Sequence, residues 1–184
     1  MFGRRIFVVS CFIFVSLSAS AESFRLSSPT VKRNSTLNAA HVSNGFGCSG
    51  GNVSPALRWS GAPAGTKSFA VTVFDPDAPT DSGWWHWVVI NIPPTVNELA
   101  ESAGSPNSRL LPETAVQVRT DFGSPGFGGA CPPMGDRPHR YVFTVYAMKT
   151  SRIDLPMDAS PALASFLIRA NEIGQARLIA TFGR

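Results

Sequence analysis

The sequence predicts a mainly β domain, a sandwich of sheets with one helix near the C-terminal end. Three segments, at 67–75, 85–93 and 139–149, are rich in β-branched and aromatic residues, as is typical of strands. Only one segment, beginning at Ser160, carries clear helix start signals. The chain has no internal repeat, linker or low-complexity tract. These observations favour a single domain in which packed strands form the core.

The first 21 residues have the pattern of a secretory signal peptide. Arg4 and Arg5 precede an apolar run, which ends in the small residues Ala19, Ser20 and Ala21. A basic start, a short apolar stretch and an A-x-A site together mark a cleavable export signal. The apolar run is short for a transmembrane span of about 20 residues, although an uncleaved anchor is the alternative. We expect cleavage after Ala21 and a periplasmic or secreted protein without a transmembrane anchor.

The remaining segment, 22–184, is predicted to be one domain that is long enough to bury its own core. Arg4 and Arg5 account for two of the 16 basic side chains, so cleavage lowers the formal net charge of +4. No Lys/Arg-rich run lies in the mature chain, which argues against nucleic acid as a partner.

The first half of the mature chain is expected to contain weaker strands and an ordered loop. Residues 23–31 form a plausible first strand with a turn at Pro29, and the Gly-, Asn- and Ser-rich segment from residue 42 leads to a short strand at 57–59. The run at 85–93 is apolar almost throughout, which predicts burial on both faces near the middle of a sheet. Period-two alternation predicts two faces: Trp84, His86 and Val88 on one, and Trp85, Trp87 and Val89 on the other.

The second half is expected to begin with a surface excursion at 94–109, followed by a weaker strand at 115–121. Segment 123–138 is too rich in Gly and Pro for a helix or a strand. Ser160 and Pro161 predict a helix N-cap and first helical residue, and Gly174 is expected to end the helix. Its predicted apolar face consists of Leu163, Phe166, Leu167, Ala170 and Ile173. Segment 176–182 is expected to be the last strand.

Cleavage removes Cys11 and leaves Cys48 and Cys131. Two cysteines in an exported chain predict one disulfide, with two separate buried thiols as the alternative. A structural zinc site is disfavoured, because neither cysteine has a partner at C-x-x-C spacing.

The segment "DPDAP" holds two carboxylates in fixed directions. Proline fixes its own φ and keeps the residue before it out of the helical region, so Asp75 and Asp77 are held extended. They are either ligand-binding acids or residues that stabilise the turn through Asx hydrogen bonds. A calcium loop is disfavoured, because Pro79 and Thr80 stand where an EF-hand needs a ligand and a glycine.

Two strands and one loop carry the remaining polar chemistry. His86 is either a satisfied core histidine or a hydrogen-bond donor to an oxyanion. His139 and Tyr141 are two residues apart on a strand and face the same side, whereas Arg140 points the other way and is expected to be solvated or paired. Tyr141 is either a donor to an anion or a core aromatic residue. In "GGACPP", around Cys131, backbone N–H groups are able to form an anion-binding nest.

These motifs together resemble the phosphatidylethanolamine-binding protein family, also called the Raf kinase inhibitor family, and most closely its bacterial branch. The matching stretches are "NGFGCSGGNVSPALRW", "DPDAP", "GWWHW", "GGACPPMGDRPHRY" and "PHRYVFTVYA". They occur in the right order over nearly all of the mature chain. The resemblance implies a β-sandwich with a C-terminal helix and a small pocket for phosphate-bearing or other anionic groups. The residues that it assigns to the pocket are Asp75, Asp77, His86, His139, Tyr141 and the backbone amides around Cys131.

Two positions depart from the eukaryotic branch of that family. Gly83 stands where an acidic residue is expected, and Trp85 stands where a second histidine is expected. These differences leave the anion pocket intact and bear on lipid or kinase specificity. A Cys48–Cys131 disulfide is expected to tie the Gly-rich loop to the "CPP" loop at the pocket rim.

The predicted function is the binding of phosphate, a phosphomonoester or a phospholipid head group, with no catalytic residue, cofactor or metal. A protein partner is also expected, and inhibition of a protease or a signalling protein is the alternative function. A metal-dependent hydrolase is less favoured, because the chain has neither an H-E-x-x-H nor a G-x-S-x-G motif.

Overall fold

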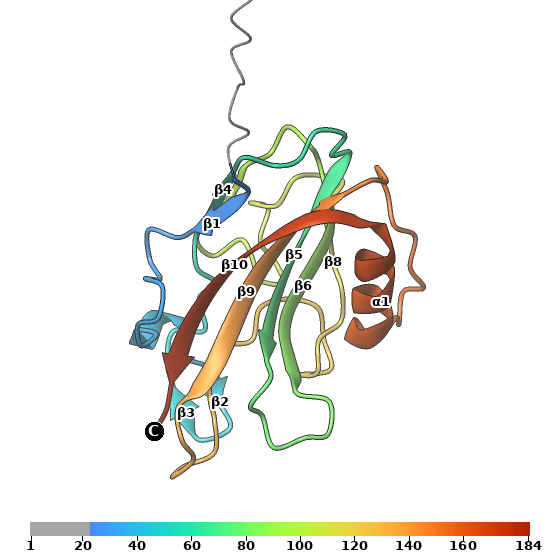
Figure 1. Cartoon of the computed structure of the whole chain (residues 1–184). Coiled ribbons are helices and arrows are strands. Elements are labelled where there is room, and N and C mark those ends of the chain that lie inside the picture. The colour runs from blue at the N-terminus through green and yellow to red at the C-terminus, as the bar shows by residue number, and fades with distance from the viewer. Residues whose placement is uncertain (1–22) are drawn as a thin grey trace, which may run out of the picture.

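The computed structural model describes residues 23–184, so the predicted signal peptide lies outside the described residues. The main element is a five-stranded antiparallel sheet (Figure 1). Its strands, in spatial order, are β10 (Glu172–Phe182), β9 (His139–Met148), β5 (Ser68–Asp75), β6 (Trp84–Ile92) and β8 (Val116–Gln117). The three segments with the strongest strand pattern thus form neighbouring strands of one sheet.

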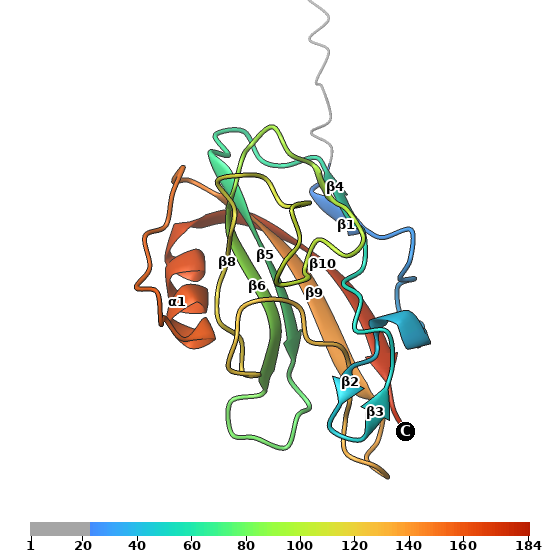
Figure 2. The same cartoon turned by 180° about the vertical axis from the view of Figure 1, so that it is seen from behind.

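Two smaller sheets complete the β structure. A three-stranded sheet contains, in order, β1 (Arg25–Ser27), β4 (Leu57–Ser60) and β7 (Glu98–Leu99). A short hairpin pairs β2 (Asn44–Gly45) with β3 (Cys48–Ser49), after the 3-10 turn η1 (Ala39–His41). Figure 2 shows this hairpin and the C-terminus at one end of the molecule, and β1 with β4 toward the other.

The main hydrophobic core lies between the large sheet and the three-stranded sheet. It joins Leu57 and Trp59 of β4 to Val71, Trp87 and Phe143 of the large sheet. A second cluster lies on the other face of the large sheet, where Val88 and Tyr146 contact helix α1 (Pro161–Asn171). The mainly β sandwich with a C-terminal helix is therefore confirmed.

Helix α1 begins as predicted but buries a different face. The Ser160 side chain accepts a hydrogen bond from the backbone N–H of Leu163, and Pro161 is the first helical residue. The buried residues are Pro161, Ala164 and Ile168, whereas Phe166 is 68% exposed. The buried stripe is rotated from the predicted face: Leu167 packs against the helix-side cluster as predicted, whereas Leu163, Phe166 and Ile173 are exposed. The predicted end was also wrong: the helix stops at Asn171, before Gly174, and β10 follows at once.

A bulge in β6 breaks the predicted alternation. Val73 pairs with Trp87 and Phe74 pairs with Trp85, so His86 is an extra residue on its strand. Trp85 consequently packs with the helix-side cluster, whereas Trp87 lies in the main core. The predicted shared face of these two tryptophans was wrong, because a bulge shifts the side-chain order by one residue.

The expected surface excursion at 94–109 is partly buried. It contributes β7 to the three-stranded sheet, and Leu99 and Ala103 belong to the main core. The weak strand expected at 115–121 is only the two residues Val116 and Gln117. Among residues 23–184, no helix has the length and apolar character needed to cross a membrane.

Candidate functional site

A cavity of about 190 Å³ opens where β5 ends and β9 begins, at the same end of the molecule as the β2–β3 hairpin. Five of its lining residues are polar or ionisable: Asp75, Thr80, His86, His139 and Tyr141. The remaining residues are Phe46, Ala78, Pro79, Trp84, Phe122, Cys131, Pro132 and Pro133. Strands β5, β6 and β9 thus bring together four of the predicted site residues from distant parts of the chain.

Asp75, the last residue of β5, is 3% exposed. Its Oδ2 lies 2.8 Å from the Nδ1 atom of His139, and its Oδ1 accepts a hydrogen bond of 2.8 Å from the backbone N–H of Asp77. The second nitrogen of His139, Nε2, lies 3.5 Å from a carboxylate oxygen of Asp136. The buried carboxylate is therefore oriented by the protein on both of its oxygens.

The His86 ring is fixed by the loop that covers it. Its Nδ1 atom lies 2.8 Å from the Gly128 carbonyl oxygen, and the Gly128 N–H donates to the His86 carbonyl oxygen at 2.8 Å. Burial lowers the pKa of His86, against smaller opposing effects of the Gly128 hydrogen bond and the charge of Asp75. The ring is therefore neutral at pH 7, with its proton on Nδ1, so that Nε2 carries a free lone pair.

Tyr141 brings an unpartnered hydroxyl to the cavity. Its side chain is 2% exposed, and its O–H finds no acceptor among the described residues. Burial is the main cause that raises the pKa of Tyr141, with a further increase from the charge of Asp75, whereas the backbone of Cys131 acts in the opposite direction. The Tyr141 ring contacts the His86 ring edge-on at 5.1 Å between centroids. A buried hydroxyl without a partner has an unused donor beside the imidazole.

Asp77, the other acid of "DPDAP", is not among the residues that line the cavity. Both of its oxygens accept hydrogen bonds of 2.8 Å from the Arg140 guanidinium, and Arg137 adds a contact of 3.1 Å. The Arg140 backbone N–H donates at 2.9 Å. The hydrogen bond from Arg140 is the main reason that the pKa of Asp77 is lowered to about 2. Asp77 therefore joins the β5–β6 turn to the start of β9, and Arg140 is paired.

The cavity rim is held by a disulfide between Cys48 and Cys131, whose Cα atoms are 6.0 Å apart. This confirms the predicted pairing of the Gly-rich loop with the "CPP" loop. Arg184 reinforces the same junction by donating hydrogen bonds to the carbonyl oxygens of Pro132, Gly47 and Phe46. Loops that are far apart in sequence thus form one rim.

Several lining residues had no signal that singled them out in the sequence. Phe122 contacts Phe46, Trp84 and His86, with ring centroids between 5.3 and 5.7 Å apart. These rings make the cavity mouth aromatic. Asn52 is a further supporting residue, because its Oδ1 accepts a hydrogen bond of 2.7 Å from the Gly129 N–H. Asparagine in a Gly-rich loop predicts a turn, and only the fold shows which loop it anchors.

The position of Gly83 explains one of the differences from the eukaryotic branch. Its φ is +69°, and a Cβ atom there would lie 2.4 Å from the Phe74 ring and 2.7 Å from the Asp75 carbonyl oxygen. No side chain fits at that distance, so the acidic residue expected at this position cannot be accommodated by this turn.

The cavity combines a carboxylate, two imidazoles and a hydroxyl with an aromatic mouth. Within the described part of the chain, no three His, Cys, Asp or Glu side chains form a group suited to a metal ion. The polar groups supply both donors and acceptors, a combination that suits a ligand with oxygen atoms and a transferable proton.

Comparisons with known proteins give one consistent result. A family model described as phosphatidylethanolamine-binding protein matches residues 27–183. The UPF0098 protein YbcL of Escherichia coli is 51% identical over 175 residues, which cover 95% of this chain and 96% of that protein. The UPF0098 protein YbhB of the same organism is 49% identical over 142 residues, which cover 77% of this chain and 89% of that protein.

Solved structures agree with these sequence matches. The crystal structure of E. coli YbcL, described as a new member of the mammalian PEBP family, matches with a TM-score of 0.86 and 53% identity, covering 88% of this chain and 98% of that one. A PEBP homologue from Chlamydia trachomatis, CT736, matches with a TM-score of 0.72 and 28% identity, with the same two coverages. This chain belongs to the phosphatidylethanolamine-binding protein family.

Proposed function

We propose that this protein is an exported binding protein for a phosphoryl group, which enters the cavity between Asp75, His86 and Tyr141. The observation that carries the proposal is the buried O–H of Tyr141, which has no acceptor among the described residues and whose ring packs edge-on against the His86 ring. A polar group of this kind costs about 1–3 kcal/mol when it is left without a partner. An oxyanion that accepts from Tyr141 would recover that cost.

The ligand is expected to carry its own proton. Asp75 and neutral His86 are acceptors, so a fully deprotonated anion would meet lone pairs on two sides. A phosphate or phosphomonoester monoanion has a P–OH group that can donate to one of these acceptors. Its other oxygens can accept from Tyr141 and from loop amides near Cys131.

The aromatic mouth favours a phosphoryl group with a small organic substituent. Phe46, Trp84 and Phe122 stand around the entrance, where they would contact a substituent that extends outward. Free phosphate, a phosphomonoester and a phospholipid head group share the phosphoryl chemistry. Their relative affinities would show which substituent the mouth prefers.

Calorimetry on protein prepared without phosphate tests this function. Tyr141→Phe should weaken the binding of phosphate and phosphoethanolamine by about fivefold, which corresponds to about 1 kcal/mol, without lowering the free energy of unfolding. Tyr146→Phe is the matched control, because Tyr146 packs in the helix-side cluster away from the cavity. Equal affinities in wild type and Tyr141→Phe would contradict the proposal.

A protein partner at the cavity mouth is the second candidate function. Phe46 is 72% exposed, and Met134, next to the lining residue Pro133, is 79% exposed. Apolar side chains of this size around a polar cavity are typical of an interaction surface. A partner that inserts a phosphorylated or acidic side chain into the cavity would use both features, as an inhibitor or modulator would.

A further inference from the structure

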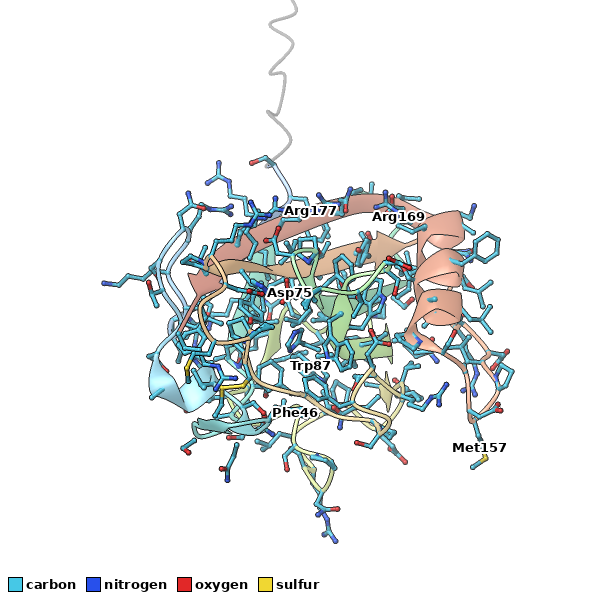
Figure 3. The ribbon with its side chains drawn as sticks, turned by 90° about the horizontal axis from the view of Figure 1, so that it is seen from below. Phe46, Asp75, Trp87, Met157, Arg169 and Arg177 are labelled. Carbon is cyan, nitrogen blue, oxygen red and sulfur yellow. A yellow bond between two sulfur atoms is a disulfide. The ribbon has the colours of Figure 1, made fainter. Side chains whose placement is uncertain are left out.

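A second, larger groove of about 770 Å³ lies on another part of the molecule. It is lined by segments of β1, β4, β7 and β10, and it shares no lining residue with the anion cavity. In Figure 3, Arg177 of this groove and Phe46 of the cavity mouth lie on opposite sides of Asp75. The groove is therefore a separate site that the proposed function does not use.

The groove is strongly basic. Four arginines line it, against a single carboxylate, Glu98, which pairs with Arg58 at 3.0 Å. The other three are Arg25, Arg33 and Arg177, and none of them forms a salt bridge with a described residue. Their hydrogen bonds go to neutral acceptors: Arg25 donates to the Ser23 hydroxyl, Arg33 to the Arg177 carbonyl oxygen, and Arg177 to the Gln175 amide oxygen. Three guanidinium groups are therefore available to an anionic ligand.

Trp59 adds an unused donor among the residues that line this groove. Its side chain is 4% exposed, and its Nε1 atom makes no hydrogen bond with any described residue. Buried indole N–H groups usually find a partner.

The groove also lies between two sheet edges. β1 is the outer strand of the three-stranded sheet, β10 is the outer strand of the large sheet, and the two strands contact each other. The C-terminal part of the β10 edge is covered, since Asn34 donates to the Ile179 carbonyl oxygen and Leu37 to that of Thr181. Toward Gln175 the cover is lighter: the Arg33 guanidinium binds the Arg177 carbonyl oxygen and Pro63 packs against Gly174, but no backbone hydrogen bond from another described loop reaches Gln175. Unpaired edge strands present main-chain donors and acceptors to an additional strand.

We propose that this groove binds an extended acidic peptide segment of a partner protein. Main-chain hydrogen bonds to the edge of β1 or β10 would hold the segment, as in other cases of strand addition. Carboxylates at alternate positions project to the same side of an extended peptide, where they meet Arg25, Arg33 and Arg177. Guanidinium groups bind carboxylates in a planar, two-bond geometry, which favours carboxylate side chains over a diffuse negative charge.

Fluorescence anisotropy with a labelled Glu-Val-Glu-Val-Glu peptide tests this site on the mature protein. Wild type should bind the peptide saturably, and Arg25→Glu/Arg177→Glu should weaken binding by at least about tenfold, because two charge-assisted contacts are lost. The matched control is Arg109→Glu/Lys149→Glu, which makes the same change in net charge on exposed side chains outside the groove. The control should bind the peptide within about twofold of wild type at 0.15 M salt, where exposed charges are screened.

Two further measurements separate this site from its alternatives. A peptide with N-methylated amides should bind at least about tenfold more weakly if main-chain pairing holds the segment. Phosphate binding in the anion cavity should be unchanged in Arg25→Glu/Arg177→Glu, so the two sites are tested independently. Three outcomes would overturn the proposal. The two double variants could weaken peptide binding equally, or the N-methylated peptide could bind as tightly as the unmodified one. The groove could also bind tripolyphosphate but not the peptide.

Discussion

The Nδ1 atom of His139 lies 2.8 Å from the Oδ2 atom of Asp75, across 64 residues of sequence and between two side chains that are 3% and 4% exposed. Asp75 is the last residue of β5 and His139 is the first residue of β9, so this contact closes the end of the sheet where the cavity opens. The backbone N–H of Asp77 occupies the other oxygen. Each carboxylate oxygen can accept more than one hydrogen bond, so Asp75 can also accept a hydrogen bond from a P–OH group of the ligand.

The first prediction is a preference for phosphate over sulfate. Sulfate has no proton near neutral pH and would meet the buried carboxylate of Asp75 without a donor. We expect phosphate to bind at least about tenfold more tightly, because its P–OH group can donate a charge-assisted hydrogen bond to Asp75, worth about 1.5–3 kcal/mol, whereas sulfate brings only negative oxygens to the carboxylate. Calorimetry with both anions measures the ratio. Equal affinities of the wild-type protein for phosphate and sulfate would mean that Asp75 accepts no hydrogen bond from the ligand.

Asp75→Asn should reduce the preference for phosphate over sulfate, because the asparagine amide can donate a hydrogen bond to sulfate. The variant should also be less stable by about 1–3 kcal/mol, since its NH2 group must face either the Asp77 N–H or the His139 nitrogen. Thermal melts therefore accompany the calorimetry, so that affinities are compared below the unfolding transition. If the folded variant keeps the wild-type ratio of phosphate to sulfate affinity, Asp75 does not accept a hydrogen bond from the ligand.

The second prediction concerns acid stability and His86. Burial holds the pKa of His86 below its ordinary value of 6.5 in the folded state. Above pH 6.5 the ring is neutral in both states; as the pH falls below 6.5, the unfolded state binds a proton that the folded state does not. Stability should therefore fall with decreasing pH below 6.5. Denaturant unfolding from pH 7.5 to 5 should show a smaller decrease in His86→Gln than in wild type, and an identical decrease would refute this assignment.

The third prediction is that the Asp77 network stabilises the fold. Asp77→Ala removes a buried carboxylate that accepts three hydrogen bonds from Arg140, and should cost about 2 kcal/mol. Glu98→Ala is the comparison, because the Arg58–Glu98 pair is exposed and should contribute less than about 1 kcal/mol. Because folding lowers the pKa of Asp77 from 3.8 to about 2, the contribution of the ionised carboxylate should be complete above about pH 4 and lost as the pH falls from there to about 2. Similar unfolding free energies for the two variants would contradict the prediction.

The fourth prediction is that the disulfide contributes substantially to stability. Cys48 and Cys131 are separated by 83 residues, for which the chain-entropy model gives about 4 kcal/mol. Cys48→Ser/Cys131→Ser should lower the free energy of unfolding by that order in denaturant titrations. It should also weaken phosphate binding, because the rim amides lose their anchor. Non-reducing peptide mapping that finds two free thiols in the wild-type protein would exclude the effect.

The fifth prediction is cleavage of the chain after Ala21 on export. The intact mass of the exported protein should correspond to a chain that begins at Glu22. A mass that includes Met1 to Ala21 would rule out cleavage, and recovery of the processed protein from the cytoplasm would rule out export.

The sequence by itself determined the class of the fold and the ionisable residues of the cavity. Strands of β-branched and aromatic residues have a strong local pattern, so β5, β6 and β9 were predicted close to their observed bounds. The motifs on these strands also named Asp75, His86, His139 and Tyr141, through their resemblance to the phosphatidylethanolamine-binding protein family. The same short-range logic placed the start of α1 at Ser160 and Pro161.

Tertiary structure decided which of these side chains share one environment. "DPDAP" gives Asp75 and Asp77 the same local pattern, yet one lines the cavity and the other binds Arg140. The bulge at His86 depends on how β5 pairs with β6, and the buried face of α1 depends on the surface that it meets. Long-range pairing also set the positions of Phe46 and Phe122 at the mouth. Sequence patterns report local backbone preference and average burial, whereas contacts between distant segments are fixed only when the sheets and loops pack together.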